Sequence, residues 1–90
     1  MPWKIIITDS FSGTFKKYKK NKEIEKALDK KIERLKENPH NVGGYLSGRL
    51  HGYKSTRLVG KFRLIFQISD SDMKLFLIAI DHRKFDYEHF

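Results

Sequence analysis

The clearest hydrophobic repeat in the chain lies between Asn21 and Pro39. Its apolar residues recur at spacings of four, four and three: Ile24, Leu28, Ile32 and Leu35. This spacing predicts one face of an α-helix. Asn21 can cap the helix, and Glu23 and Glu25 fall in its first turn, where negative charge complements the helix dipole. Asn38-Pro39 should end the helix, because the residue before a proline avoids the α region.

A different pattern opens the chain. Residues 3–8 form an apolar run unbroken by charge after Lys4, which predicts a strand buried on both faces. Asp9 and Ser10 can cap a helix that follows at once. In that helix, aromatic residues at i, i+4 and i+7 share one face: Phe11, Phe15 and Tyr18. The two helices should form an antiparallel hairpin that covers a sheet.

Alternation with period two appears on both sides of Val59-Gly60-Lys61. Glycine accepts positive φ, so this stretch predicts a β-hairpin with its turn at those three residues. In the second strand, four side chains are expected to point toward the core: Phe62, Leu64, Phe66 and Ile68. The alternate side chains are expected on the opposite face: Lys61, Arg63, Ile65 and Gln67.

The remaining stretches complete the expected fold. Residues 40–48 read as a glycine-containing loop, 69–72 as a turn, and 73–80 as a near-continuous apolar strand placed centrally in the sheet. The last ten residues, 81–90, restore charge directly after that strand. The prediction is a single α+β domain over residues 1–90, with two layers in the order β-α-α-β-β-β and an antiparallel meander at its end.

Charge changes the picture of this fold. The formal net charge of the 90-residue chain is +8, and no Asp or Glu occurs from His40 to Ser69. The same interval holds five cations: Arg49, Lys54, Arg57, Lys61 and Arg63. Such an imbalance favours a polyanionic partner, whether nucleic acid, an acidic protein or an anionic membrane surface. The plainer interpretation is a basic sheet edge that discourages strand pairing.

Composition excludes several kinds of site. The absence of cysteine excludes a disulfide framework, a thiolate nucleophile and a zinc site built on sulfur. The four histidines show no metal-ligand spacing, so we expect no metal site. No apolar run is long enough for a signal peptide or a membrane helix, which makes a soluble cytoplasmic protein the expectation.

Two segments resemble the RelE/ParE toxin superfamily of toxin-antitoxin systems. The first, LHGYKSTRLVGKFRLIF at 50–66, is similar to the family's leucine-glycine entry, basic strand, glycine turn and aromatic-Arg-aliphatic-aliphatic-aromatic strand. The second, DHRKFDY at 81–87, is similar to its terminal His-Arg with a tyrosine four residues after the arginine. The resemblance covers nearly the whole chain.

The resemblance implies a compact toxin that needs no cofactor, enters the ribosomal decoding site and cuts messenger RNA there, and is masked by a RelB-like antitoxin. Lys54 matches the family's catalytic lysine and Arg63 its phosphate-binding arginine. Arg83 and Tyr87 match its C-terminal arginine and tyrosine. The chain departs from the pattern at Thr56, where some ribosome-dependent members have a second basic residue.

Cleavage of RNA without a metal requires the 2′-hydroxyl to attack the adjacent phosphate. The reaction needs a base, positive charge for the crowded phosphorane and an acid for the leaving oxygen. Arg63 and Arg83 suit the second role, since a guanidinium binds phosphate through two N–H groups. Lys54 or His82 can serve as base or acid, and Tyr87 can stack on a base or approach the hydroxyl.

Three further cations are expected to contact RNA phosphates: Arg49, Arg57 and Lys61. Structural alternatives stand beside these roles. Arg63 can pair with a helix glutamate, His82 can bond to backbone at a strand end, and Tyr87 can pack on the sheet. Two functional alternatives also remain, because other branches of the superfamily act on DNA gyrase and a basic module can bind nucleic acid without cutting it.

Overall fold

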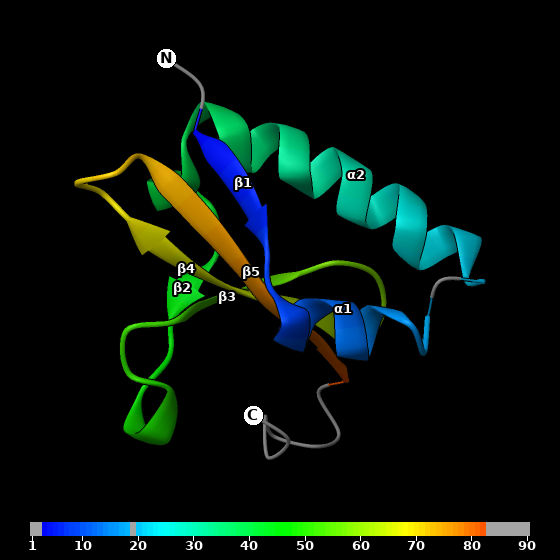
Figure 1. Cartoon of the computed structure of the whole chain (residues 1–90). Coiled ribbons are helices and arrows are strands. Elements are labelled where there is room, and N and C mark those ends of the chain that lie inside the picture. The colour runs from blue at the N-terminus through cyan, green and yellow to red at the C-terminus, as the bar shows by residue number, and fades with distance from the viewer. Residues whose placement is uncertain (1–2, 19, 83–90) are drawn as a thin grey trace.

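A computed structural model describes residues 3–18 and 20–82 as one sheet covered on one face by two helices (Figure 1). Its elements in chain order are β1 (Lys4–Ile7), α1 (Asp9–Phe15), α2 (Lys22–Glu37), β2 (Gly44–Tyr45), β3 (Lys54–Arg57), β4 (Phe62–Ser69) and β5 (Lys74–His82). Two short 3₁₀ turns, η1 (Pro39–Asn41) and η2 (Gly48–Leu50), flank β2. The α+β class and the order of the predicted elements are confirmed.

The sheet has five strands in the order β1-β5-β4-β3-β2. β1 pairs with β5 in parallel, and the other neighbours are antiparallel. The apolar strand β5 therefore lies inside the sheet, as predicted. The sequence prediction missed β2, which replaces part of the expected loop over 40–48 with a two-residue pairing to β3.

The expectation that the first strand is buried on both faces is wrong. β1 has a single neighbour in the sheet, and the side chain of Ile7 is 54% exposed. An edge strand leaves one of its sides open to solvent however apolar its sequence is. The start of β1 is fixed instead by a backbone bond from Trp3 N to Lys36 O of 3.1 Å, at the end of α2.

The longer helix follows its sequence signals. Asn21 caps α2 by accepting hydrogen bonds from the backbone N–H groups of Glu23 and Ile24, and the helix ends before Asn38-Pro39 as predicted. The shorter helix differs, because Thr8 and not Asp9 or Ser10 is its cap. The Thr8 hydroxyl accepts from Phe11 N at 3.1 Å and donates to Leu77 O at 2.6 Å, so it ties the helix start to β5.

The predicted helix over Phe11 to Tyr18 stops early, at Phe15. Tighter bonds, from Lys17 N to Thr14 O and from Tyr18 N to Phe15 O, replace the α-helical ones after that point. Tyr18 nevertheless packs on the core from outside the helix. The chain then turns back into α2 (Figure 1).

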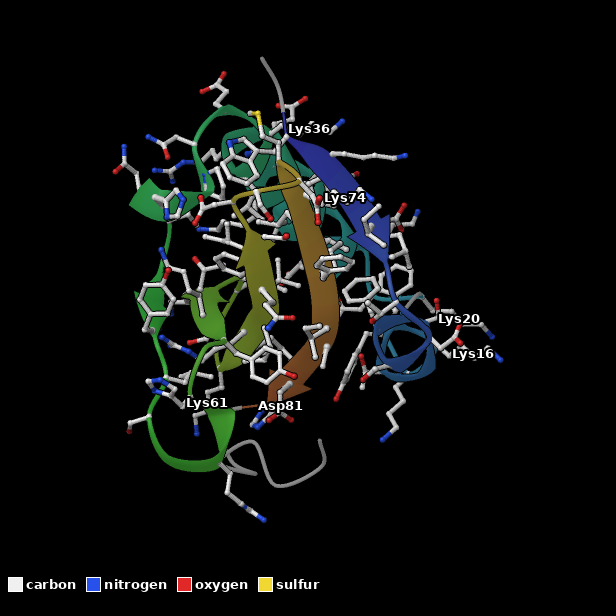
Figure 2. The ribbon with its side chains drawn as sticks, turned by 60° about the vertical axis from the view of Figure 1, so that its left-hand side comes forward. Lys16, Lys20, Lys36, Lys61, Lys74 and Asp81 are labelled. Atoms are coloured by element: carbon white, nitrogen blue, oxygen red, sulfur yellow. The ribbon has the colours of Figure 1, made fainter. Side chains whose placement is uncertain are left out.

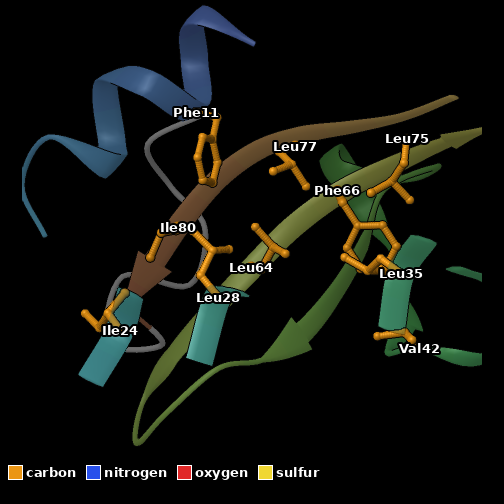
Figure 3. Close-up of a cluster of buried hydrophobic side chains, with 10 residues drawn as sticks. All are labelled: Phe11, Ile24, Leu28, Leu35, Val42, Leu64, Phe66, Leu75, Leu77 and Ile80. Carbon is orange, nitrogen blue, oxygen red and sulfur yellow. The ribbon is translucent and has the colours of Figure 1, made fainter. Parts of the chain in front are cut away.

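The core lies between the helices and one face of the sheet (Figure 3). The two helices contribute Phe11, Ile24, Leu28 and Leu35. The sheet contributes Leu64, Phe66, Leu75, Leu77 and Ile80, and Val42 closes one end. Phe62 and Ile68 pack against this cluster, so the core-facing set predicted for the second hairpin strand is confirmed.

Candidate functional site

Arg63 lies on the face of β4 that points away from the helices. The register places Arg57 of β3 on one side of it and Asp81 of β5 on the other. Directly opposed residues of antiparallel strands share a face of the sheet. The Nε of half-buried Arg63 donates a 3.4 Å hydrogen bond to the Ser55 hydroxyl, which orients the guanidinium.

Arg57 and Arg63 form a directly opposed pair of like charges. Such pairs destabilise a sheet unless an anion lies between them. Arg57 Nε donates to Gly60 O at 3.1 Å, which holds its guanidinium to the hairpin turn. Within residues 3–18 and 20–82 the single ion pair of 4.0 Å or less joins His40 to Asp70, so no described carboxylate oxygen lies within 4.0 Å of a nitrogen of either arginine guanidinium. The pair is therefore suited to bind an anion such as phosphate.

Asp81 stands opposite Arg63 because of a β-bulge. The register between β4 and β5 shifts by one residue between Ile65 and Phe66. Asp81 is 6% exposed, and its Oδ1 accepts a 3.0 Å bond from His82 N. Its Oδ2 is buried with no hydrogen-bond partner among the described residues. Burial, with the charge of Asp81 as a second cause, raises the pKa of Tyr18.

Lys54 does not join Arg63. The register pairs it with Phe66, so its side chain lies on the helix-facing side of the sheet, and only 3% of the residue is exposed. Its Nζ donates to Pro39 O at 3.3 Å and His40 O at 3.0 Å, and lies 5.0 Å from the ring centroid of Tyr45. Burial lowers the pKa of Lys54. Lys54 and Arg63 therefore lie on opposite faces of the sheet, and the catalytic role expected for Lys54 stays a prediction.

Thr56 follows the same geometry. It is buried, opposite Leu64 on the helix-facing side of the sheet. A lysine here would have to carry its ammonium group into the apolar layer or extend past it, which is costly without a partner. The uncharged residue at position 56, which departs from the family pattern, is thus consistent with the burial of this position.

His82 is also on the helix-facing side. It is opposite Phe62 in the register, and the two rings meet edge to face at 4.9 Å between centroids. The ring of Tyr18 contacts Phe62 at 5.0 Å in a second T-shaped pair. The structure therefore places His82 in an aromatic cluster and not with Arg63. Arg83 and Tyr87 lie outside the described residues.

The other predicted RNA contacts are exposed. Lys61 lies in the β3–β4 turn, at the same end of the sheet as Asp81 (Figure 2). Arg49 lies in η2, in the segment between β2 and β3. Of the predicted phosphate contacts among the described residues, Arg57 is the one that the fold brings beside Arg63.

Sequence reasoning missed the Arg57-Arg63 pair, although the signal was present. A turn at residues 59–61 makes Leu58 and Phe62 neighbours, and counting back one more residue on each strand pairs Arg57 with Arg63. The same counting places Lys54 opposite Phe66. No sequence signal predicts the bulge that brings in Asp81.

Two wider properties follow from the described residues. Across 3–18 and 20–82, no group of three or more His, Cys, Asp or Glu side chains is placed to hold a metal ion. No helix in this part of the chain has the length and apolar character needed to span a bilayer.

Comparison with known proteins identifies the family. A profile of the ParE toxin of the type II toxin-antitoxin system parDE matches residues 5–87. No curated protein sequence matches the chain. The RelBE2 toxin-antitoxin complex of Mycobacterium tuberculosis contains a chain of 26% identity and TM-score 0.77, with 92% of this chain and 100% of that chain covered.

Two further solved structures share the fold. Free toxin RelE of Escherichia coli is 20% identical, with TM-score 0.71 over 93% of this chain and 86% of that one. A chain of the YoeB-YefM complex of Staphylococcus aureus is 18% identical, with TM-score 0.72 over 91% and 98%. The profile match spans most of the sequence, and the chain therefore belongs to the ParE toxin family of type II toxin-antitoxin systems, within the RelE/ParE superfamily.

Proposed function

We propose that this toxin is a ribosome-dependent endoribonuclease that cleaves translated messenger RNA by attack of the 2′-hydroxyl on the adjacent phosphate, without a metal. The observation that carries the proposal is the Arg57-Arg63 pair, which is opposed in register and has no described carboxylate partner. An RNA phosphate placed between these guanidinium groups would relieve their repulsion and accept hydrogen bonds from both.

Arg63 is the central residue of this proposal. Its Nε is engaged by Ser55, which leaves the terminal N–H groups of a pre-oriented guanidinium for phosphate. Charge fixed before the reaction stabilises the phosphorane without reorganisation at the moment of attack. Arg57 would hold the same or the neighbouring phosphate from the turn.

The proton transfers need other groups, because Lys54 and His82 face the helices. In this proposal Arg83 is a second phosphate ligand, and Tyr87 stacks on a base or approaches the attacking hydroxyl. The proposed targets are the ribosome and messenger RNA in the cytoplasm. The proposed partner is a cognate antitoxin, as the solved complexes of the M. tuberculosis and S. aureus relatives suggest for this chain.

Primer extension on a defined messenger RNA in a translation extract tests the proposal. The wild type should cut at codon positions, and only when ribosomes are present. Arg63→Ala should reduce cutting by roughly 10²-fold, as expected for loss of one preorganised charge. Lys16→Ala removes an exposed charge at the C-terminal cap of α1 and serves as the matched control (Figure 2). Undiminished cutting by Arg63→Ala would refute the proposed centre.

Gyrase inhibition is the second candidate. The observation that favours it is that both proton-transfer candidates among the described residues, Lys54 and His82, lie on the side of the sheet opposite to Arg63. A protein that only binds its target needs no acid or base. Incubation with gyrase and supercoiled DNA separates the two, since this candidate predicts DNA breaks together with intact messenger RNA. Retained RNA affinity with neither product would instead indicate a non-catalytic binding protein.

A further inference from the structure

Most charged residues of helix α2 fall into two rows. Four acidic residues recur every fourth position: Glu25, Asp29, Glu33 and Glu37. A basic row lies beside them with the same period: Lys22, Lys26, Lys30 and Arg34. At 1.5 Å per residue, each four-residue step advances about 6 Å along the helix. This places evenly spaced cations along one side of α2, at a step comparable with that between successive phosphates of a polynucleotide strand.

The basic row borders a groove between α2 and the β3–β4 turn. The groove has a volume of about 510 Å³, and three apolar residues line it: Ala27, Leu58 and Val59. Its lining also contains one acidic residue, Glu23, and four basic residues: Lys26, Lys30, Lys31 and Arg34. In Figure 1 the chain between β3 and β4 passes beneath α2.

The cations of this groove form no close ion pair with the described acidic residues beside them. In the described ranges, no carboxylate lies within 4.0 Å of Lys26, Lys30, Lys31 or Arg34, since the one ion pair there is between His40 and Asp70. Burial first, and the charge of Arg34 second, lower the pKa of Lys31. A concentration of unpaired positive charge over a hollow favours an anionic occupant.

We propose that this groove binds the sugar-phosphate backbone of an RNA strand, as a second contact distinct from the Arg57-Arg63 pair. The inference rests on the proposed function only for the identity of the partner as RNA. The two sites are connected, because Leu58 and Val59 of the groove directly follow Arg57, whose Nε bonds to Gly60 O in the same turn. A strand of several nucleotides can therefore pass round the turn and contact both. This continuity and the even spacing favour RNA over an acidic protein segment.

A salt series with an uncleavable probe tests the groove. The probe is a fluorescent single-stranded 2′-O-methyl RNA, which has no free hydroxyl for attack. The test variant is the triple Lys26→Gln, Lys30→Gln and Arg34→Gln. The control is Lys16→Gln, Lys17→Gln and Lys20→Gln, which removes the same charge from exposed residues at and after α1 (Figure 2). Glutamine is a good helix former, and circular dichroism of both variants checks that the fold is retained.

The groove variant should bind roughly tenfold more weakly at low salt, and the slope of log affinity against log salt should fall by about 2, as for three lost phosphate contacts on a single strand. The control should keep most of the wild-type slope. An equal loss in both variants would overturn the proposal, because net charge alone would then explain the binding. Unchanged RNA binding by the groove variant, with weakened binding of the cognate antitoxin, would overturn it in favour of an acidic protein partner.

The proposed nuclease function and the RNA groove can be refuted independently. The probe cannot be cleaved, so the slope reports contacts alone. If wild-type protein does not cut messenger RNA but the groove variant shows the expected loss of slope, the nuclease proposal fails and the RNA groove stands. If cutting requires Arg63 but the groove variant keeps the wild-type salt slope, the nuclease proposal stands and the RNA groove fails.

Discussion

Replacing Lys54 by methionine distinguishes a structural role for this residue from the catalytic role that the family resemblance implies. Methionine keeps the unbranched apolar stem and fills similar space. The substitution removes two hydrogen bonds, to Pro39 O at 3.3 Å and to His40 O at 3.0 Å. It also removes the cation from its place 5.0 Å from the centroid of Tyr45.

The expected cost follows from these contacts. A hydrogen bond to a charged group contributes about 1.5–3 kcal/mol, and the longer bond belongs at the low end of that range. The cation-π contact adds about 0.5–1 kcal/mol. Against this, burial of an ammonium group is itself unfavourable, as the lowered pKa of Lys54 shows. We expect a net loss of about 2 kcal/mol in the free energy of unfolding, or roughly 10 °C in Tm for a domain of this size.

Urea denaturation measures this loss, followed by circular dichroism and by fluorescence of Trp3, the single tryptophan. Lys61→Met is the matched control, because Lys61 is exposed in a turn and should change stability by less than about 0.5 kcal/mol. The same samples enter the primer-extension assay. If Lys54→Met has unchanged stability but no longer cleaves RNA, the structural role is refuted and a catalytic role for Lys54 is supported.

The pH dependence supplies a second test of the same residue. In the folded protein the pKa of Lys54 lies below 10.5, the value expected in the unfolded chain. As the pH rises toward 10.5, the folded protein therefore loses this proton before the unfolded chain does. Stability from this group then rises with pH across that interval. The stability gap between wild type and Lys54→Met should therefore widen on titration from neutral pH toward about 10. A gap that narrows would contradict the assigned burial.

Three further predictions follow from single positions. Gly43→Ala should destabilise the fold by more than about 2 kcal/mol, because φ of Gly43 is +67° and the new Cβ would lie 2.1 Å from Ser55 O. Gly13→Ala, where the new Cβ meets open space, should instead stabilise α1 by about 0.5–1 kcal/mol. Equal denaturation midpoints for the two variants would contradict both predictions. Asp81→Asn should lower the pKa of Tyr18, because a charge that raises it is removed, and NMR titration of ring-labelled tyrosine would show an unmoved value if the two groups do not interact. Thr8→Val should cost about 1–2 kcal/mol through loss of the α1 cap and the bond to Leu77, and a thermal melt identical to wild type would argue against that role.

The opposed arginines are the feature on which the function proposed for this chain rests. A scaffold shared by toxins with different targets does not by itself establish activity. Here the hairpin holds two guanidinium groups on one face, a neutral Ser55 orients one of them, and the unpaired carboxylate oxygen of Asp81 lies on the adjoining strand. The arrangement supports the proposed phosphate recognition, and primer extension with variants of Tyr87 tests whether that residue takes part in the proposed cleavage.

The sequence by itself determined the elements whose signals are local. The repeat from Ile24 to Leu35, the Asn21 cap and the proline after Asn38 define α2 without reference to any other segment, because helix bonds and caps join residues close in sequence. The turn around Gly60 fixed the β3–β4 hairpin for the same reason. Arg63 could be nominated as functional from its place among apolar neighbours.

Only the tertiary structure decided which of the nominated residues meet. The face of Lys54 depends on register across the hairpin, and its hydrogen-bond partners come from η1, which is distant in sequence. The exposure of β1 depends on its position at the sheet edge, which a run of isoleucines does not encode. Asp81 stands opposite Arg63 because of a one-residue shift in strand pairing. Because side-chain direction alternates with every residue in a strand, a shift of one residue decides the composition of the site.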